Sequence, residues 1–279
     1  MMKKTFAIIL SFCSVIFFGQ KIKVLDSETQ KPIPYAKLIL KEKAYYRNTE
    51  ENGEAMLENS EEISEIQSFG YENLKVESYQ NLYHLKPVYK EIAEVKVARP
   101  KFDKTIIIGD LKKKTAYSAV EKTWMVGKVI VQTAEKQKLF LRKIRFPSFN
   151  YNKNDVIINV NIFENKNGLP GDIIVSKPVL CKRGSRITDW MLDRPVSFPQ
   201  EGVIVCFEWI INAQNQYDTE MRYSDGHIKK IKGIYPIIGG NESSKNSGMV
   251  SGVLINGEWK FKDYSNGKSS LSIQLELTN

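Results

Sequence analysis

Four residues near the C-terminus combine aromatic rings with groups that hydrogen-bond hydroxyls, which is how many protein surfaces bind sugars. Trp259 and Tyr264 could stack on the face of a sugar ring. Asp263 and Asn266 lie between or beside them and could bond its hydroxyl groups. We therefore take Trp259, Tyr264, Asp263 and Asn266 as a candidate ligand-binding set.

A second and looser set of the same kind is formed by Tyr223, Asp225 and His227. The alternative for any such aromatic residue is a place in the hydrophobic core, and this is what we expect for Trp209, which lies in an apolar run. Glu208 precedes it, and we expect this carboxylate to face outward or to pair with an arginine.

Motifs of hydrolytic catalysis are missing from the sequence. There is no Gly-x-Ser-x-Gly, no His-Glu-x-x-His and no phosphate-binding Gly-rich loop. His84 and His227 lie in separate predicted domains, so they do not make a zinc site. We expect a non-enzymatic protein with no catalytic residue, no metal and no cofactor. A hydrolase of unrecognised type stays open as an alternative, because folding can bring two carboxylates together.

Three cysteines are present, and two of them, Cys181 and Cys206, lie beyond the N-terminal segment. Each lies in or beside a predicted strand. They could form a disulfide if their Cα atoms come within about 7 Å. They could equally be two buried, small hydrophobic thiols.

The N-terminus is typical of a secretory signal. Lys3 and Lys4 are followed by a mostly apolar stretch from Phe6 to Phe18, which is too short to span a membrane comfortably. We expect residues 1–19 to be removed and the mature protein to leave the bacterial cytoplasm, for the periplasm, the outer-membrane surface or the extracellular medium. A lipoprotein attached through Cys13 is the alternative, although Phe12 before it is bulkier than lipidation signals prefer. No later apolar run predicts a membrane span in the mature chain.

Charge divides the chain unevenly. Residues 20–97 hold 11 basic and 14 acidic side chains, whereas residues 98–279 hold 28 and 18. This shift favours a domain boundary near residue 98. The basic second part could meet an anionic partner such as an acidic glycan, or could be a solvated lysine-rich surface. Export makes nucleic acid an unsuitable partner.

Short, partly alternating apolar runs separated by turn residues predict an all-β protein. The last run is the clearest, because Leu271, Ile273, Leu275 and Leu277 alternate with polar residues. Asn-Gly pairs, which favour tight hairpins, occur at 52–53, 167–168, 256–257 and 266–267. We expect two consecutive antiparallel β-sandwich domains.

The first of these domains resembles the carboxypeptidase-regulatory-like (transthyretin-like) domain over residues 22–97. The resemblance rests on short segments in a fixed order, namely Ile22-Lys23-Val24-Leu25-Asp26, Lys31-Pro32-Ile33-Pro34-Tyr35-Ala36, Asn48 to Ala55, Ser68-Phe69-Gly70-Tyr71-Glu72 and Leu85 to Val97. It implies a seven-stranded sandwich without catalytic residues, which in exported bacterial proteins is commonly an N-terminal accessory module.

The expected organisation is therefore a signal peptide (1–19), this module (20–97), a linker (98–117) and a second, jelly-roll-like sandwich (118–279). Within the linker, Thr105 to Ile108 could pair as a strand with either sandwich. The second sandwich is similar to uncharacterised β-sandwich regions of exported bacterial proteins, notably over Glu201 to Trp209. Our leading hypothesis is an accessory or binding protein of the cell envelope, with a docking or spacer module in front and a ligand-binding module behind. The partner would be a cell-surface glycan or an outer-membrane protein, and a carbohydrate-binding module proper is the alternative.

Overall fold

The computed structural model describes residues 19–41, 45–89, 104–120, 124–132, 138–242 and 247–279. The chain divides into two compact units, Met1–Tyr89 and Lys90–Asn279. All regular structure in the described residues is β-strand, which confirms the all-β prediction. None of these residues belongs to a helix that could cross a membrane. The predicted signal peptide, apart from Gly19, lies outside the described residues.

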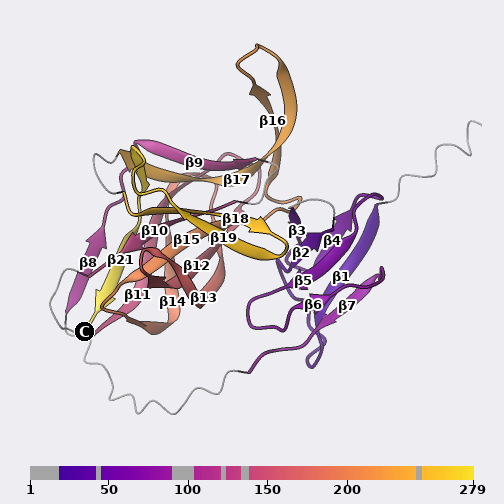
Figure 1. The fold of residues 1–279 in the computed structure, drawn as a ribbon, viewed down its shortest axis with the longest axis horizontal. Helices are drawn as coiled ribbons and strands as arrows, with labels where there is room; N and C mark the ends of the chain where they lie inside the picture. The colour runs from indigo at the N-terminus through magenta and orange to yellow at the C-terminus, as the bar shows by residue number, and fades with distance from the viewer. Residues whose placement is uncertain (1–18, 42–44, 90–103, 121–123, 133–137, 243–246) are drawn as a thin grey trace, which may run out of the picture. The chain divides into compact units, whose positions relative to one another are not determined.

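The first unit contains two small sheets, with strand orders β4-β1-β7 and β3-β2-β5-β6 (Figure 1). Its strands are β1 (Gln20–Asp26), β2 (Lys37–Leu40), β3 (Tyr46–Asn48), β4 (Glu54–Leu57), β5 (Ile63–Gln67), β6 (Leu74–Lys75) and β7 (Leu82–Leu85). We expected antiparallel pairing throughout. β1 does pair antiparallel with β4, but it pairs parallel with β7. The predicted closing strand at residues 91–97 lies outside the described residues.

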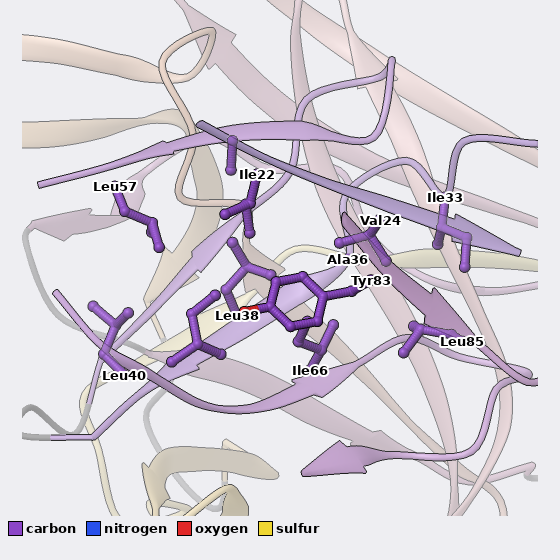
Figure 2. Packing of buried hydrophobic residues seen from close by; sticks show 12 residues of the cluster. Ile22, Val24, Ile33, Ala36, Leu38, Leu40, Leu57, Ile66, Tyr83 and Leu85 are labelled. Carbon is purple, nitrogen blue, oxygen red and sulfur yellow. The ribbon is translucent and has the colours of Figure 1, made fainter. Parts of the chain in front are cut away.

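Apolar side chains from both sheets meet in one core. In β1, Ile22 and Val24 point inward while Lys21 and Lys23 point outward, as the period of two in a strand requires. Figure 2 shows Leu38, Ile66 and Tyr83 gathered around the same centre as Ile22 and Val24. The first unit therefore has its own hydrophobic core.

The second unit contains a six-stranded sheet, of order β13-β12-β15-β10-β18-β19, and an eight-stranded sheet. The larger sheet has the order β16-β17-β11-β21-β8; in addition β14 pairs with β11, and both β9 and β20 pair with β17. The strands are β8 (Thr105–Gly109), β9 (Thr115–Val120), β10 (Met125–Ile130), β11 (Leu139–Asn150), β12 (Val156–Lys166), β13 (Leu169–Cys181), β14 (Gly184–Phe198), β15 (Val203–Trp209), β16 (Gln216–Arg222), β17 (Ile228–Glu242), β18 (Met249–Ile255), β19 (Glu258–Asp263), β20 (Ser269–Leu271) and β21 (Gln274–Thr278).

The two sheets pack face to face. Phe146 of β11 and Phe207 of β15 meet in the core with their ring centroids 4.7 Å apart. The six-stranded sheet is also strongly curled, because its outer strands β13 and β19 contact each other and Phe163 of β12 reaches Phe261 of β19 (5.7 Å). It therefore has one face on the eight-stranded sheet and one concave face of its own.

We predicted a linker at residues 98–117. Residues 104–117 instead supply strands to the second unit. β8 pairs with β21 from Thr105 to Gly109, and β9 pairs with β17. The alternation in β8 explains this, because Ile106 and Ile108 are half-buried while Ile107 is exposed. Residues 98–103 of the predicted linker lie outside the described residues.

Two of the predicted Asn-Gly turns join hairpins. Asn167 and Gly168 both have positive φ between β12 and β13, and Asn256 and Gly257 do the same between β18 and β19. This is the backbone geometry of a two-residue hairpin turn that follows the twist of its strands. A third hairpin, β16–β17, belongs to the eight-stranded sheet, and its tip projects beyond the rest of the second unit (orange, Figure 1).

Candidate functional site

The four candidate ligand-binding residues do not converge on one site. Trp259 lies near the start of β19 and is half-buried, whereas Asp263 ends that strand, about 13 Å further along at roughly 3.3 Å per residue. Tyr264 and Asn266 lie in the following turn and are exposed. The Asp263 carboxylate accepts hydrogen bonds from the amide and hydroxyl of Ser265 in the same turn.

Trp259 is part of the apolar lining of the concave face. It packs with Phe261 against the buried cluster that includes Phe163 and Val250. A Cβ at Gly252 would lie 2.7 Å from the Phe261 ring and 3.3 Å from the Trp259 ring, so both rings lie over this glycine. These contacts make packing the main role of Trp259.

Glu208 lies on the same concave face and is buried, with 4% of its surface exposed. Our expectation of an outward-facing side chain is therefore wrong. Its carboxylate accepts hydrogen bonds from the side-chain amides of Asn161 (3.1 Å) and Asn159 (3.4 Å) on the neighbouring strand β12. Asn159 in turn donates to the hydroxyl of Ser176 on β13 (3.1 Å). This polar row stabilises a buried carboxylate inside an otherwise apolar face.

Three tyrosines that we did not single out from the sequence form a cluster at one end of the sandwich. Tyr235 of β17 stacks on Tyr217 of β16, with centroids 4.1 Å apart and planes 20° apart. Tyr151, which follows β11, meets Tyr235 edge to face at 6.3 Å. The Tyr151 side chain is 61% exposed, so its ring is available to a ligand.

The register of β16 and β17 explains where Tyr217 lies. It stands opposite Gly233, where a Cβ would come within 2.3 Å of its ring. Covering a glycine with a cross-strand aromatic ring is a known way of filling a sheet face. Burial raises the pKa of both Tyr217 and Tyr235, so their hydroxyls remain protonated donors at neutral pH.

An asparagine-rich loop at residues 211–215 holds the tyrosine cluster in place. The buried Asn215 side chain bonds both the amide and the carbonyl of Ile157 (3.0 and 2.6 Å). Its backbone carbonyl accepts from the amide of Tyr235 (2.9 Å). Asn152, next to Tyr151, donates to the carbonyl of Gln214 (2.8 Å). The cluster thus rests on a fixed scaffold and is flanked by the half-exposed amides of Asn152 and Gln214.

The second, looser set is partly assembled at the tip of the β16–β17 hairpin. The rings of Tyr223 and His227 stack almost parallel, with centroids 4.5 Å apart. Asp225 accepts a hydrogen bond from the backbone amide of His227 (3.0 Å) and shapes the turn. Tyr223 remains 39% exposed.

Cys181 and Cys206 are both buried and free, so the disulfide that we considered is not formed. Their partners across β12 are Val156 and Asn161, five residues or about 16 Å apart along one strand, whereas a bridge needs Cα atoms within about 7 Å. Burial raises the pKa of the Cys181 thiol to about 12, and that of Cys206 is raised by burial and by Glu208. Neither is an activated nucleophile.

Across the described ranges, no group of three or more His, Cys, Asp or Glu side chains is placed to hold a metal ion. His84 contacts Gln30 within the first unit, while His227 is at the hairpin tip.

No family model matches this sequence, and no curated protein matches it. Among solved structures, it is similar to a clostridial cysteine protease, Cwp84, after propeptide cleavage (TM-score 0.40, 13% identity, 63% of this chain and 40% of that one). It is also similar to the cysteine protease and lectin-like domains of Cwp84, a surface layer associated protein of Clostridium difficile (TM-score 0.36, 12% identity, 57% and 33%). The chain thus spans less than half of either structure, and neither similarity bears on its activity or ligand.

Proposed function

We propose that this chain is an exported, non-enzymatic binding protein of the bacterial cell envelope whose second unit binds a glycan at the tyrosine cluster. The observation that carries this proposal is the exposed Tyr151 ring, which meets Tyr235 edge to face while Tyr235 stacks on Tyr217. A flat aromatic face offers apolar contact to the C–H groups of a sugar ring.

The surroundings of the cluster support a sugar in preference to an apolar ligand. The flanking side-chain amides of Asn152 and Gln214 each donate one hydrogen bond within the protein, to the carbonyls of Gln214 and Asp155. Each amide has a second N–H that a sugar hydroxyl could accept. The bonds of Asn215 hold the scaffold in one conformation before a ligand arrives, which lowers the entropic cost of binding.

The first unit would serve as the docking or spacer module that its resemblance to the carboxypeptidase-regulatory-like domain implies. Export is proposed from the N-terminal signal alone. Mass spectrometry of the protein purified from its native envelope should find a mature N-terminus at or close to residue 20, since a signal peptide is removed on export. An intact Met1, or a lipid on Cys13, would contradict that reading.

Replacing Tyr151 by alanine should weaken glycan binding about tenfold, because a stacking aromatic face is lost while the fold is kept. A glycan array should first identify the ligands of the full chain, and calorimetry on the best of them should measure the effect.

Tyr264→Ala is the matched control, since Tyr264 is 55% exposed and lies in a different turn. It should leave the affinity unchanged. A loss with Tyr264→Ala and none with Tyr151→Ala would move the site to the end of β19. Absence of binding to any glycan would reject the proposal, and cleavage of the bound oligosaccharide would reject its non-enzymatic part.

A further inference from the structure

We infer that the ligand is an extended, unbranched polysaccharide that runs from the tyrosine cluster along one face of the β16–β17 hairpin. This inference rests on the proposed function and adds to it the class of glycan and the surface that carries it.

The hairpin has two different faces. Cross-strand register puts Tyr217 opposite Gly233, Thr219 opposite Ile231 and Met221 opposite Lys229. These positions share one face, because side chains alternate along a strand and directly paired residues point to the same side. Tyr223 continues the alternation, and its amide bonds the carbonyl of His227 (2.9 Å).

The opposite face carries mostly charged side chains. Asp218 forms an ion pair with Lys232 (2.5 Å), and Glu220 stands opposite Lys230. Because both β16 and β17 contribute charged side chains to this face, we expect the face to stay solvated. The aromatic face therefore has no counterpart on the other side of the hairpin.

The aromatic face is long and continuous with the proposed site. Tyr217 belongs to the cluster, Met221 is half-buried, and the Tyr223–His227 stack ends the row. Tyr223 lies six positions after Tyr217, or about 20 Å along the strand at roughly 3.3 Å per residue. Several linked sugar rings can cover that length, whereas a single sugar cannot.

A polysaccharide fits this face better than a partner protein does. The aromatic rings stand at the two ends of this face, and between them Thr219 and Met221 are half-buried while Ile231 is buried. The accessible surface is therefore long and narrow, unlike the compact apolar centre from which protein interfaces gain most of their affinity. A linear chain of sugar rings, each with an apolar face and polar edges, matches a narrow path between two aromatic ends.

The test is the length dependence of binding by the full chain. The probes are cello-, chito-, xylo- and maltooligosaccharides, each as the mono-, di-, tetra- and hexasaccharide. In the series that binds, affinity should rise from the disaccharide to the hexasaccharide. Tyr223→Ala should lower hexasaccharide affinity about tenfold and leave disaccharide affinity unchanged, whereas Tyr151→Ala should weaken every length.

Lys230→Ala, on the charged face of the same hairpin, is the control and should change nothing. Equal affinity for all lengths, or an unaffected hexasaccharide in Tyr223→Ala, would overturn the extended path and leave the site at Tyr151 standing. An equal loss in Lys230→Ala would overturn the aromatic face as the track. No binding to any of the four series would overturn the inference and, together with an empty glycan array, the proposed function.

Discussion

Replacing Trp209 by alanine should lower the free energy of unfolding of the second unit by about 3–5 kcal/mol, the range for a fully buried tryptophan. Only 1% of the side chain is exposed. Its ring stacks on Trp124 with centroids 5.5 Å apart, and its Nε1–H donates to the carbonyl of Pro236 (2.7 Å). Alanine would leave a cavity and an unpaired buried carbonyl.

The measurement is guanidinium unfolding followed by tryptophan fluorescence. All four tryptophans lie in the second unit, so this signal reports on that unit alone. Trp209→Phe keeps an aromatic ring but loses the hydrogen bond, and should cost about 1–3 kcal/mol. It also serves as the readout if Trp209→Ala does not fold. A loss below about 1 kcal/mol in the alanine variant would show that this side chain does not hold the sandwich together.

Replacing Arg47 by alanine should have the largest effect in the first unit, about 3 kcal/mol or more, because it removes the cation beside a buried carboxylate. The Nε–H of Arg47 lies 2.8 and 3.0 Å from the two carboxylate oxygens of Glu61, whose side chain is 3% exposed. Nη2 donates to the more exposed Glu58 (3.2 Å).

Hydrogen exchange of first-unit backbone amides would measure this loss. Adding Glu61→Gln to the Arg47→Ala variant should restore part of it, because a neutral amide is easier to bury than an unpaired charge. Lys86→Ala is the control: it breaks the exposed pair with Glu72 (2.9 Å) and should cost no more than about 0.5 kcal/mol. Equal losses in Arg47→Ala and Lys86→Ala would contradict the buried-pair argument.

Period-two patterns predicted the all-β class and several of the strands, but not the partners of those strands. Leu271 to Leu277 was expected as one strand, and its alternating apolar residues are indeed all buried. The segment nevertheless forms two strands. β20 ends at Leu271 and pairs with β17, whereas β21 pairs with β11 and β8. Alternation in a sequence specifies which side chains point inward, and says nothing about which distant strand will accept the hydrogen bonds.

The tyrosine cluster was missed for the same reason. Tyr151, Tyr217 and Tyr235 come from three separate segments, and only the pairing of β16 with β17 and the bonds of Asn215 bring them together. Trp259 was overvalued because nothing in its neighbouring residues shows that Phe261 and Gly252 will help to enclose it. The Tyr223–His227 pair was foreseeable, since both residues flank one tight turn.

The curl of the six-stranded sheet has a consequence for solubility. A flat sheet leaves two rows of unsatisfied backbone groups that can recruit strands from other molecules and start aggregation. In the six-stranded sheet the two edge strands are β13 and β19, and these two strands contact each other. At one end of the larger sheet is β16, whose exposed Asp218, Glu220 and Arg222 place a charged side chain at every second position of that edge, a common defence against fibril growth. Both arrangements limit the addition of strands from other molecules to this unit.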